Sequence, residues 1–199
     1  MLPPLLQQVA GYGYAVFTNG DYDLNLIGIR SKGREANEFD DLMTCTYKEG
    51  GRWVTRYWPC TTDPGAYWLE NPSRVSGTAI LVPGQYRGAY RLDKHQGRYE
   101  ALCQREGKVK VFRDSNKDKI LDMDPNTIEE GFFGINIHRA SSRRESPEVE
   151  RWSAGCQVFQ KIEDYKEFME LCKNSSALYG NSFSYTLVTE QDLRKHLDK

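Results

Sequence analysis

The sequence has little histidine, no closely paired cysteines and no long apolar run, and each shortage excludes a class of protein or site. Histidine occurs only at positions 95, 138 and 196. The five cysteines, at positions 45, 60, 103, 156 and 172, include no C-x-x-C pair. They therefore have neither the spacing of a zinc site nor the density of a disulfide framework. No apolar run approaches the roughly 18 residues of a membrane-spanning helix, so we expect no membrane span.

An excess of charge of one sign is also missing. The 27 basic and 28 acidic residues leave a formal net charge of -1. Proteins that hold nucleic acid usually do so through a broad positive field, so no nucleic-acid partner is expected. The first residues lack the basic segment and the apolar run of a signal peptide. This indicates synthesis in the cytoplasm with no visible export signal.

What the chain does contain favours one mainly β domain, with a few short helices, over residues 1–199. Hydrophobic residues make up 39% and charged residues 28% of the chain, which is typical of a globular protein. Alternating apolar residues and turn residues predict strands over residues 14–17, 24–29, 42–47, 53–58, 78–82, 109–112, 132–137 and 183–188, with an edge strand over 85–90. Helical spacing predicts helices over residues 3–10, 162–172 and 189–197.

Residues 132–159 carry the clearest chemical signal. A thiol is a weak nucleophile until a base takes its proton, and a neutral imidazole within reach can do so. His138 follows an apolar segment, and Cys156 follows Ser153 and Gly155, which allow a sharp turn. The backbone N–H groups around the cysteine are candidates for an oxyanion hole. The segment therefore predicts a nucleophile and its general base.

The residues alone leave a second interpretation open. Cys156 is then a small buried side chain, and His138 an incidental surface residue. The other two histidines, His95 and His196, are expected at the surface, because their neighbourhoods in the sequence contain no nucleophile.

The same segment resembles the catalytic motif of the L,D-transpeptidase (YkuD-type) family: a histidine, a spacer, then Ser/Thr-His-Gly-Cys and an apolar residue. Ser153 lies fifteen positions after His138, and Gly155, Cys156 and Val158 continue the pattern. The resemblance implies a β-sandwich or barrel catalytic domain. In such a domain the cysteine is acylated by a peptidoglycan stem peptide, and an amine or water accepts the acyl group. No cofactor is implied.

The resemblance also assigns a role to each matching residue. Cys156 is the nucleophile and His138 its general base. The backbone carbonyl of Arg139 orients the imidazole of the base. Ser153 and Gly155 shape the turn and the oxyanion site.

Substrate contacts are expected around Ala154, Arg143 and Arg151. Ala154 stands where the family has its second histidine, a position associated with substrate placement. The departure leaves open whether the reaction is transpeptidation or hydrolysis of the carboxypeptidase or endopeptidase type. Arginine binds carboxylates in bidentate fashion, and stem peptides carry carboxylates. Interleaved glutamates make a solvated loop an equal alternative.

The setting and two rival functions follow from the same resemblance. A wall enzyme with no visible export signal resembles a phage or prophage lysis protein, so we expect action at the periplasm or cell wall after release or export. The rivals are a catalytically silent wall-binding or virion structural module and a cysteine hydrolase of another amide. Thiol labelling is expected to distinguish an active enzyme from the silent module. An activated Cys156 reacts with iodoacetamide at a pH well below the pKa of a free thiol, about 8.5.

Residues 114–125 resemble an incomplete calcium loop. Oxygen-bearing side chains occupy positions 1, 3, 5 and 9 of the loop pattern, namely Asp114, Asn116, Asp118 and Asp122. However, Lys119 replaces the usual glycine, and Pro125 replaces the bidentate glutamate. A solvated acidic loop and a partial calcium site are therefore both open.

Overall fold

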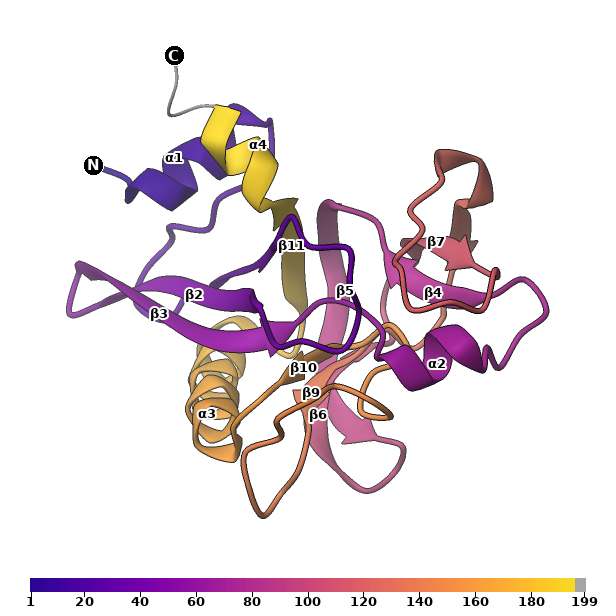
Figure 1. Cartoon of the computed structure of the whole chain (residues 1–199). Helices are drawn as coiled ribbons and strands as arrows, with labels where there is room; N and C mark the ends of the chain where they lie inside the picture. Colours follow the sequence, from indigo (N-terminus) through magenta and orange to yellow (C-terminus); the bar gives the residue numbers. More distant parts are fainter. Residues whose placement is uncertain (196–199) are drawn as a thin grey trace.

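The strands form a closed barrel with a smaller sheet beside it (Figure 1). The computed structural model describes residues 1–195. In order around the barrel, the strands are β1 (Asn25–Arg30), β11 (Phe183–Thr189), β5 (Gly84–His95), β6 (Tyr99–Gln104), β9 (Ile137–Arg139), β10 (Gln157–Phe159), β3 (Arg52–Thr61) and β2 (Asp41–Glu49). The smaller sheet has the order β4 (Thr78–Leu81), β7 (Val109–Asp114) and β8 (Glu129–Gly131). The prediction of a mainly β fold with a few helices is confirmed.

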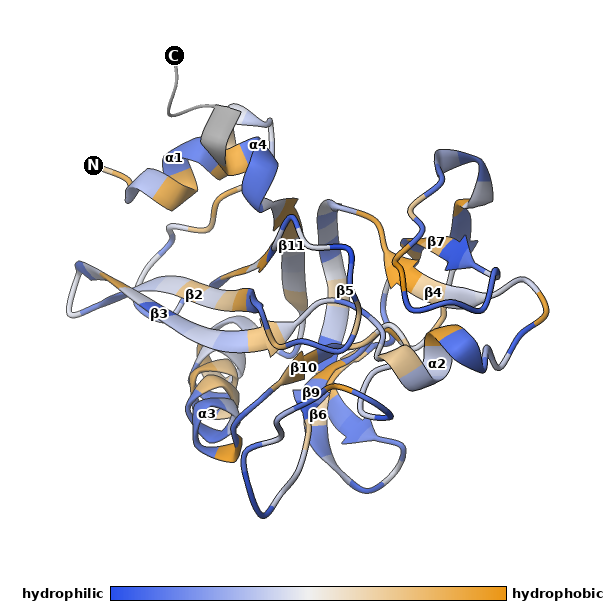
Figure 2. Ribbon diagram, in the orientation of Figure 1, coloured by the Kyte–Doolittle hydropathy of each residue, from blue (hydrophilic) through white to orange (hydrophobic). Residues whose placement is uncertain are grey.

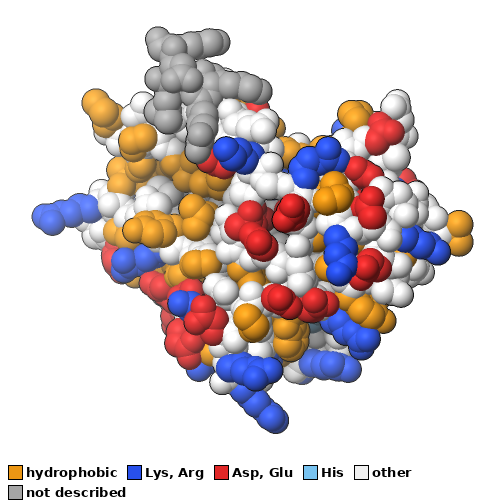
Figure 3. Space-filling view, viewed as in Figure 1, with side chains coloured by type: hydrophobic (Ala, Val, Ile, Leu, Met, Phe, Trp, Pro, Cys, Tyr) orange, Lys and Arg blue, Asp and Glu red, His pale blue; other side chains and the backbone are white. Residues whose placement is uncertain are grey.

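The barrel and the smaller sheet share one apolar core. Leu81 of β4 and Val111 of β7 belong to the same buried cluster as Tyr90 and Tyr185 of the barrel wall. β4 is buried along its whole length, and its most apolar part lies toward the end of the strand (orange in Figure 2). On the outer face shown in Figure 3, basic and acidic side chains are interspersed, in keeping with the net charge of -1.

The helices of the described residues are α1 (Pro4–Gly11), α2 (Ala66–Glu70), the 3-10 turn η1 (Pro125–Thr127), α3 (Ile162–Tyr179) and α4 (Glu190–Lys195). α3 packs against the barrel, where the rings of Phe168 and Phe159 lie 4.9 Å apart. α1 and α4 lie side by side (Figure 1) and share an apolar cluster that contains Leu6 and Leu193. None of the helices within residues 1–195 has the length and apolarity that a membrane crossing requires. Of the helix predicted over 189–197, residues 196–197 lie outside the described residues.

The hairpin of β2 and β3 follows from its turn residues. Gly50 and Gly51 have φ angles of 57° and 75°. A two-residue type I′ turn needs positive φ at both central positions, and glycine accepts this without strain. The predicted strands over 42–47 and 53–58 lie inside this hairpin.

No strand forms over residues 14–17, because side-chain amides take the place of a partner strand. Gln85 accepts a hydrogen bond from the N–H of Ala15 and donates one to its carbonyl, both at 2.9 Å. Asn25 does the same for Phe17, at 2.8 and 2.9 Å. The backbone groups are satisfied without a sheet, and the strand prediction is wrong here.

A third side-chain amide, that of Gln104, shortens the strand predicted over 132–137. β9 begins only at Ile137, because the Oε1 atom of Gln104 accepts hydrogen bonds from the three preceding N–H groups of Phe133, Gly134 and Ile135. These distances are 3.1, 3.0 and 3.1 Å. The strand predicted over 85–90 forms the first half of β5 and pairs with β11, while β6 pairs with β5 from Tyr90 onward. β6 was not predicted.

A buried guanidinium joins the barrel to the smaller sheet. Arg30 at the end of β1 is 2% exposed. It donates to both Thr62 Oγ1 and the Thr62 carbonyl, at 3.0 and 2.9 Å, and to the Leu81 carbonyl at the end of β4, at 2.8 Å. Its Nε atom lies 2.9 Å from Asp63 Oδ1, out of line for a hydrogen bond to that oxygen. Burial raises the pKa of Asp63 to about 7, against the opposing effect of Arg30.

We expect Asp63→Ala to destabilise the protein strongly, because it leaves the buried charge of Arg30 without its counter-ion. Removing one partner of a buried ion pair costs about 3–5 kcal/mol. Urea unfolding at pH 8, where Asp63 is ionised, measures the loss. Glu106→Ala is the matched control, since it removes the exposed ion pair with Arg91 and should change the unfolding midpoint far less. Equal effects of the two substitutions would contradict this account of Arg30.

Candidate active site

Two neighbouring parallel strands position the predicted catalytic residues, with His138 on β9 and Cys156 just before β10. β9 and β10 pair with His138 opposite Val158. Cys156 comes directly before β10 and lies next to Asn136, whose N–H is 3.4 Å from its sulfur. The sulfur in turn donates to the carbonyl of Gly134 at 3.4 Å. The other four cysteines are buried, whereas Cys156 keeps some exposed surface.

The turn before Cys156 is built as predicted from Ser153 and Gly155. The Ser153 hydroxyl donates to the carbonyl of Cys156 at 2.8 Å and accepts from the N–H of Gly155 at 3.1 Å. Gly155 has a φ of 116°, and a Cβ atom there would lie only 2.4 Å from the carbonyl oxygen of Ala79. A side chain at this position would therefore displace the turn that carries the thiol.

His138 is held by the contact expected from Arg139. Its Nδ1 atom lies 2.8 Å from the Arg139 carbonyl oxygen. Because a carbonyl can only accept, Nδ1 carries the hydrogen and Nε2 keeps its lone pair. The Tyr99 hydroxyl lies 3.2 Å from Nδ1 and donates to the same carbonyl at 3.3 Å. The Arg139 guanidinium covers the ring of Tyr99 at 4.0 Å. These contacts fix one tautomer and one ring orientation.

His95 is not a surface residue, so its predicted placement is wrong. It is 8% exposed, and its ring stacks on that of His138 with centroids 4.0 Å apart and an interplanar angle of 26°. The order β5-β6-β9 brings the end of β5 to the base across the barrel wall. Asn136 Nδ2 donates to His95 Nδ1 at 3.1 Å, while Asn136 Oδ1 accepts from the N–H of Gln104 at 2.9 Å. His196 lies outside the described residues.

Burial keeps both members of the pair neutral in the resting protein. It lowers the pKa of His138 to about 3, with the nearby His95 adding to the effect. It raises the pKa of Cys156 to about 11. Within residues 1–195, the hydrogen bonds of the sulfur go to the backbone of Gly134 and Asn136, and none goes to His138. The site thus combines an un-ionised thiol with an imidazole that can accept a proton at Nε2.

The predicted substrate arginines do not join this cluster. Arg151 is exposed and stacks over the ring of Tyr67 at 4.0 Å. Arg143 is exposed on the loop between β9 and β10, where its N–H donates to the Ser141 hydroxyl. Ala154 is exposed and lines a small hollow of about 120 Å³. Of the three, only Ala154 lies next to the thiol turn.

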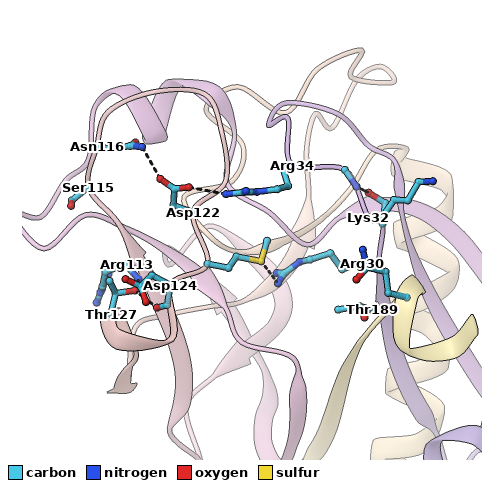
Figure 4. A pocket seen from close by; sticks show the side chains of 14 residues that line it. Arg30, Lys32, Arg34, Arg113, Ser115, Asn116, Asp122, Asp124, Thr127 and Thr189 are labelled. Carbon is cyan, nitrogen blue, oxygen red and sulfur yellow. Dashed lines mark hydrogen bonds and ion pairs between the residues drawn. The ribbon is translucent and has the colours of Figure 1, made fainter. Parts of the chain in front are cut away.

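A larger hollow, with a volume of about 700 Å³, lies elsewhere (Figure 4). Arg30, Arg34, Arg113 and Asp122 are among its lining residues, and neither Cys156 nor His138 is. In Figure 4, Arg34 and Asn116 both reach toward Asp122. We assign no role in the chemistry to this hollow.

The loop predicted as a partial calcium site has its polar groups bonded to one another. Asp114 is buried, and its Oδ2 accepts from the N–H of Asp122 at 2.9 Å. Asn116 Nδ2 donates to the carboxylates of Asp118 and Asp122 at 2.9 and 2.6 Å. No group of three or more His, Cys, Asp or Glu side chains among the described residues is placed to hold a metal. Calcium binding here stays a prediction.

Residues of the site that the sequence did not indicate come from distant strands. Tyr99 and Gln104 lie on β6, and His95 ends β5. Their separation from Cys156 along the chain hides them from any local pattern. A scan against protein-family models and searches of curated proteins and solved structures found no match.

We expect iodoacetamide to label Cys156 of the free protein slowly at pH 7 and faster as pH rises toward about 11. The reason is that only the thiolate reacts and that burial raises the pKa of this thiol. Mass spectrometry of the intact protein between pH 6 and 11 measures the rate. Cys156→Ser is the control, because the remaining cysteines are buried. An inflection below pH 8 would reveal a preformed thiolate and contradict the expectation. The expectation from the sequence, labelling well below pH 8.5 in an active protein, is replaced because burial raises the pKa of this thiol, so slow labelling does not identify a silent protein.

Proposed function

We propose that this chain is a cysteine-dependent acyltransferase or hydrolase of the L,D-transpeptidase type, acting on the stem peptides of peptidoglycan. One observation carries the proposal. His138 lies on β9 and Cys156 directly precedes the adjacent parallel strand β10, in the chain order and with the spacing of that family's motif. The Arg139 carbonyl fixes the imidazole so that Nε2 is free to accept a proton. This combination supports general-base activation of a thiol.

In the proposed reaction, Cys156 Sγ attacks the carbonyl carbon of a stem residue while its proton passes to His138 Nε2. The carbonyl π electrons move to oxygen, and a tetrahedral intermediate forms. Its collapse restores the carbonyl and breaks the C–N bond, and the imidazolium returns the proton to the leaving amine. An amine or water then attacks the thioester carbon while His138 Nε2 takes its proton, the C–S bond breaks, and the proton passes to the departing sulfur, which restores the Cys156 thiol. Thus the same pair serves both transpeptidation and hydrolysis.

The oxyanion formed in the first step needs hydrogen-bond donors near the thiol turn. The N–H of Gly155 is already bonded to the Ser153 hydroxyl. The N–H of Cys156 makes no backbone or side-chain hydrogen bond among the described residues, and we assign it to the oxyanion. Ser153 and Gly155 therefore act by shaping the turn.

The resting charge state determines when proton transfer occurs. With the thiol pKa near 11 and the imidazole pKa near 3, a preformed ion pair is strongly unfavourable. Proton transfer must therefore accompany formation of the C–S bond.

A catalytically silent wall-binding or virion module is the second candidate. The observation that favours it is the hydrogen bonding of the Cys156 sulfur, which involves backbone groups and not the imidazole. Replacement of the family's second histidine by Ala154 points the same way. Turnover separates the two candidates, since only the enzyme releases fragments from the wall.

We expect Cys156→Ala to abolish turnover of purified sacculi and muropeptides while the fold is kept. The substitution removes the nucleophile at a partly exposed position, so circular dichroism and thermal unfolding should be nearly unchanged. Mass spectrometry of the products identifies the bond broken and tells transfer from hydrolysis. If the variant is as active as the original protein, Cys156 is not the nucleophile and the proposal fails.

In the pH profile of kcat/KM, the acid limb should have its midpoint at a pH well below the ordinary histidine pKa of about 6.5. This limb reports the free-enzyme base, and burial, assisted by His95, lowers the pKa of His138 to about 3. His95→Phe keeps a stacked ring but removes its titratable group, so the limb should move to higher pH. His95→Ala serves as the comparison that loses the stack as well. An unmoved acid limb in both variants would exclude a role for His95.

A further inference from the structure

The small hollow next to Ala154 is lined by positive charge without a negative counterpart. It has a volume of about 120 Å³, and Arg74 and Arg113 are its charged lining residues. Both guanidinium groups lie over the ring of Phe133, at 6.0 and 4.7 Å from its centroid. Trp68 closes part of the wall. No carboxylate of residues 1–195 lines this hollow.

Two segments of the chain lead directly from this hollow to the thiol. Ala154 lines the hollow and lies two residues before Cys156, and two residues of extended chain span at most about 7 Å. Phe133 lines it as well, and the next residue, Gly134, accepts the hydrogen bond of the Cys156 sulfur. A substrate whose carbonyl lies at the sulfur therefore has its next one or two residues within reach of the hollow.

The two arginines differ in how far their charge is already balanced. Arg113 is 7% exposed, and its Nε atom donates to Glu129 Oε2 at 2.9 Å. Its Nη2 atom also lies 2.9 Å from that oxygen but is out of line for a hydrogen bond. Arg74 is exposed, and within the described part of the chain it has no carboxylate partner. One guanidinium charge at the hollow is thus uncompensated.

We propose that this hollow is the subsite that binds a carboxylate of the substrate, with Arg74 as its ligand and Arg113 as a fixed charge behind it. The inference rests on the proposed acyl transfer at Cys156. The planar fork of arginine matches a carboxylate in bidentate geometry, and the Phe133 ring below both guanidinium groups holds them in place. The volume equals that of roughly four water molecules, which suits a carboxylate on a small side chain.

The subsite selects substrates by charge close to the scissile bond. A stem peptide with a free carboxylate one or two residues from the attacked carbonyl binds in register with Cys156. An amidated stem loses this contact and leaves Arg74 unpaired. The exposed Arg143 and Arg151, which the sequence offered as substrate contacts, do not line this hollow.

The test pairs Arg74→Ala with a synthetic stem tetrapeptide and with analogues in which one carboxylate at a time is a carboxamide. Arg74→Ala should lower kcat/KM for the parent peptide by about tenfold to a hundredfold, the usual range for a hydrogen bond to a charged group. With the original protein, one carboxamide analogue should show the same loss of kcat/KM relative to the parent peptide. With Arg74→Ala, that analogue should show no further loss, as a double-mutant cycle requires of two groups in contact. Arg87→Ala is the matched control, because Arg87 is also exposed and stacks on a ring, that of Phe17; it should leave all rates unchanged.

Binding to the inactive Cys156→Ala protein separates failure of the subsite from failure of the proposed function. Isothermal titration with the parent peptide and with each carboxamide should show one analogue that binds more weakly, and Arg74→Ala in the same background should remove that difference. This pattern without turnover in the original protein would support the subsite and reject the acyl transfer. Two results would overturn the subsite while leaving the acyl transfer supported. One is turnover together with equal binding of every peptide; the other is turnover in which the loss of kcat/KM caused by Arg74→Ala adds to the loss caused by each carboxamide. No binding of any peptide would also overturn the subsite.

Discussion

The buried guanidinium of Arg30 is the interaction on which the positions of the barrel, the smaller sheet and the thiol depend. It joins the end of β1 to the Leu81 carbonyl at the end of β4 and to both polar groups of Thr62. The Thr62 carbonyl also faces Gln157 Nε2 at 3.4 Å, and Gln157 Oε1 accepts from the hydroxyl of the buried Tyr185. A continuous polar network therefore runs from Arg30 to the residue that follows Cys156. Such networks are costly to break in part, because each member is buried.

The candidate site uses burial for a different purpose. Both rings of the histidine stack are shielded from water, and the low local dielectric disfavours any isolated charge. His138 is consequently neutral and ready to accept a proton, while the thiol remains protonated. In the proposed reaction, His138 becomes charged only when a bound reactant accepts the electrons of the Cys156 sulfur. The protonated thiol of such a site reacts slowly with small electrophiles. In the proposed reaction, a substrate must fit closely against the sulfur before the thiol loses its proton.

Structure that depends on neighbouring residues in the sequence was predictable. Structure that depends on a side chain distant in the sequence was not. The β2–β3 hairpin and the long helix α3 follow from turn glycines and apolar spacing. The segments at 14–17 and 132–136 failed because Gln85 and Gln104 replace neighbouring strands as hydrogen-bond partners. In the same way, the turn of Ser153 and Gly155 before Cys156 could be inferred from the residues of that stretch. The stacked His95 and the arginines of the hollow could not, since tertiary contacts alone bring them there.

The single oxygen of Gln104 that gathers three N–H groups has a consequence for the surface loop between β9 and β10. It bends residues 133–135 from inside the barrel and so presents the Gly134 carbonyl to the sulfur. The immediate surroundings of the thiol are thus set by the interior of the fold. The loop over 140–152 supplies none of these contacts, although Val149 anchors it elsewhere through burial and a hydrogen bond from its N–H to the Asn37 carbonyl at 3.0 Å. Substitutions at its exposed positions, such as Arg143 and Arg144, therefore leave the surroundings of the sulfur unchanged.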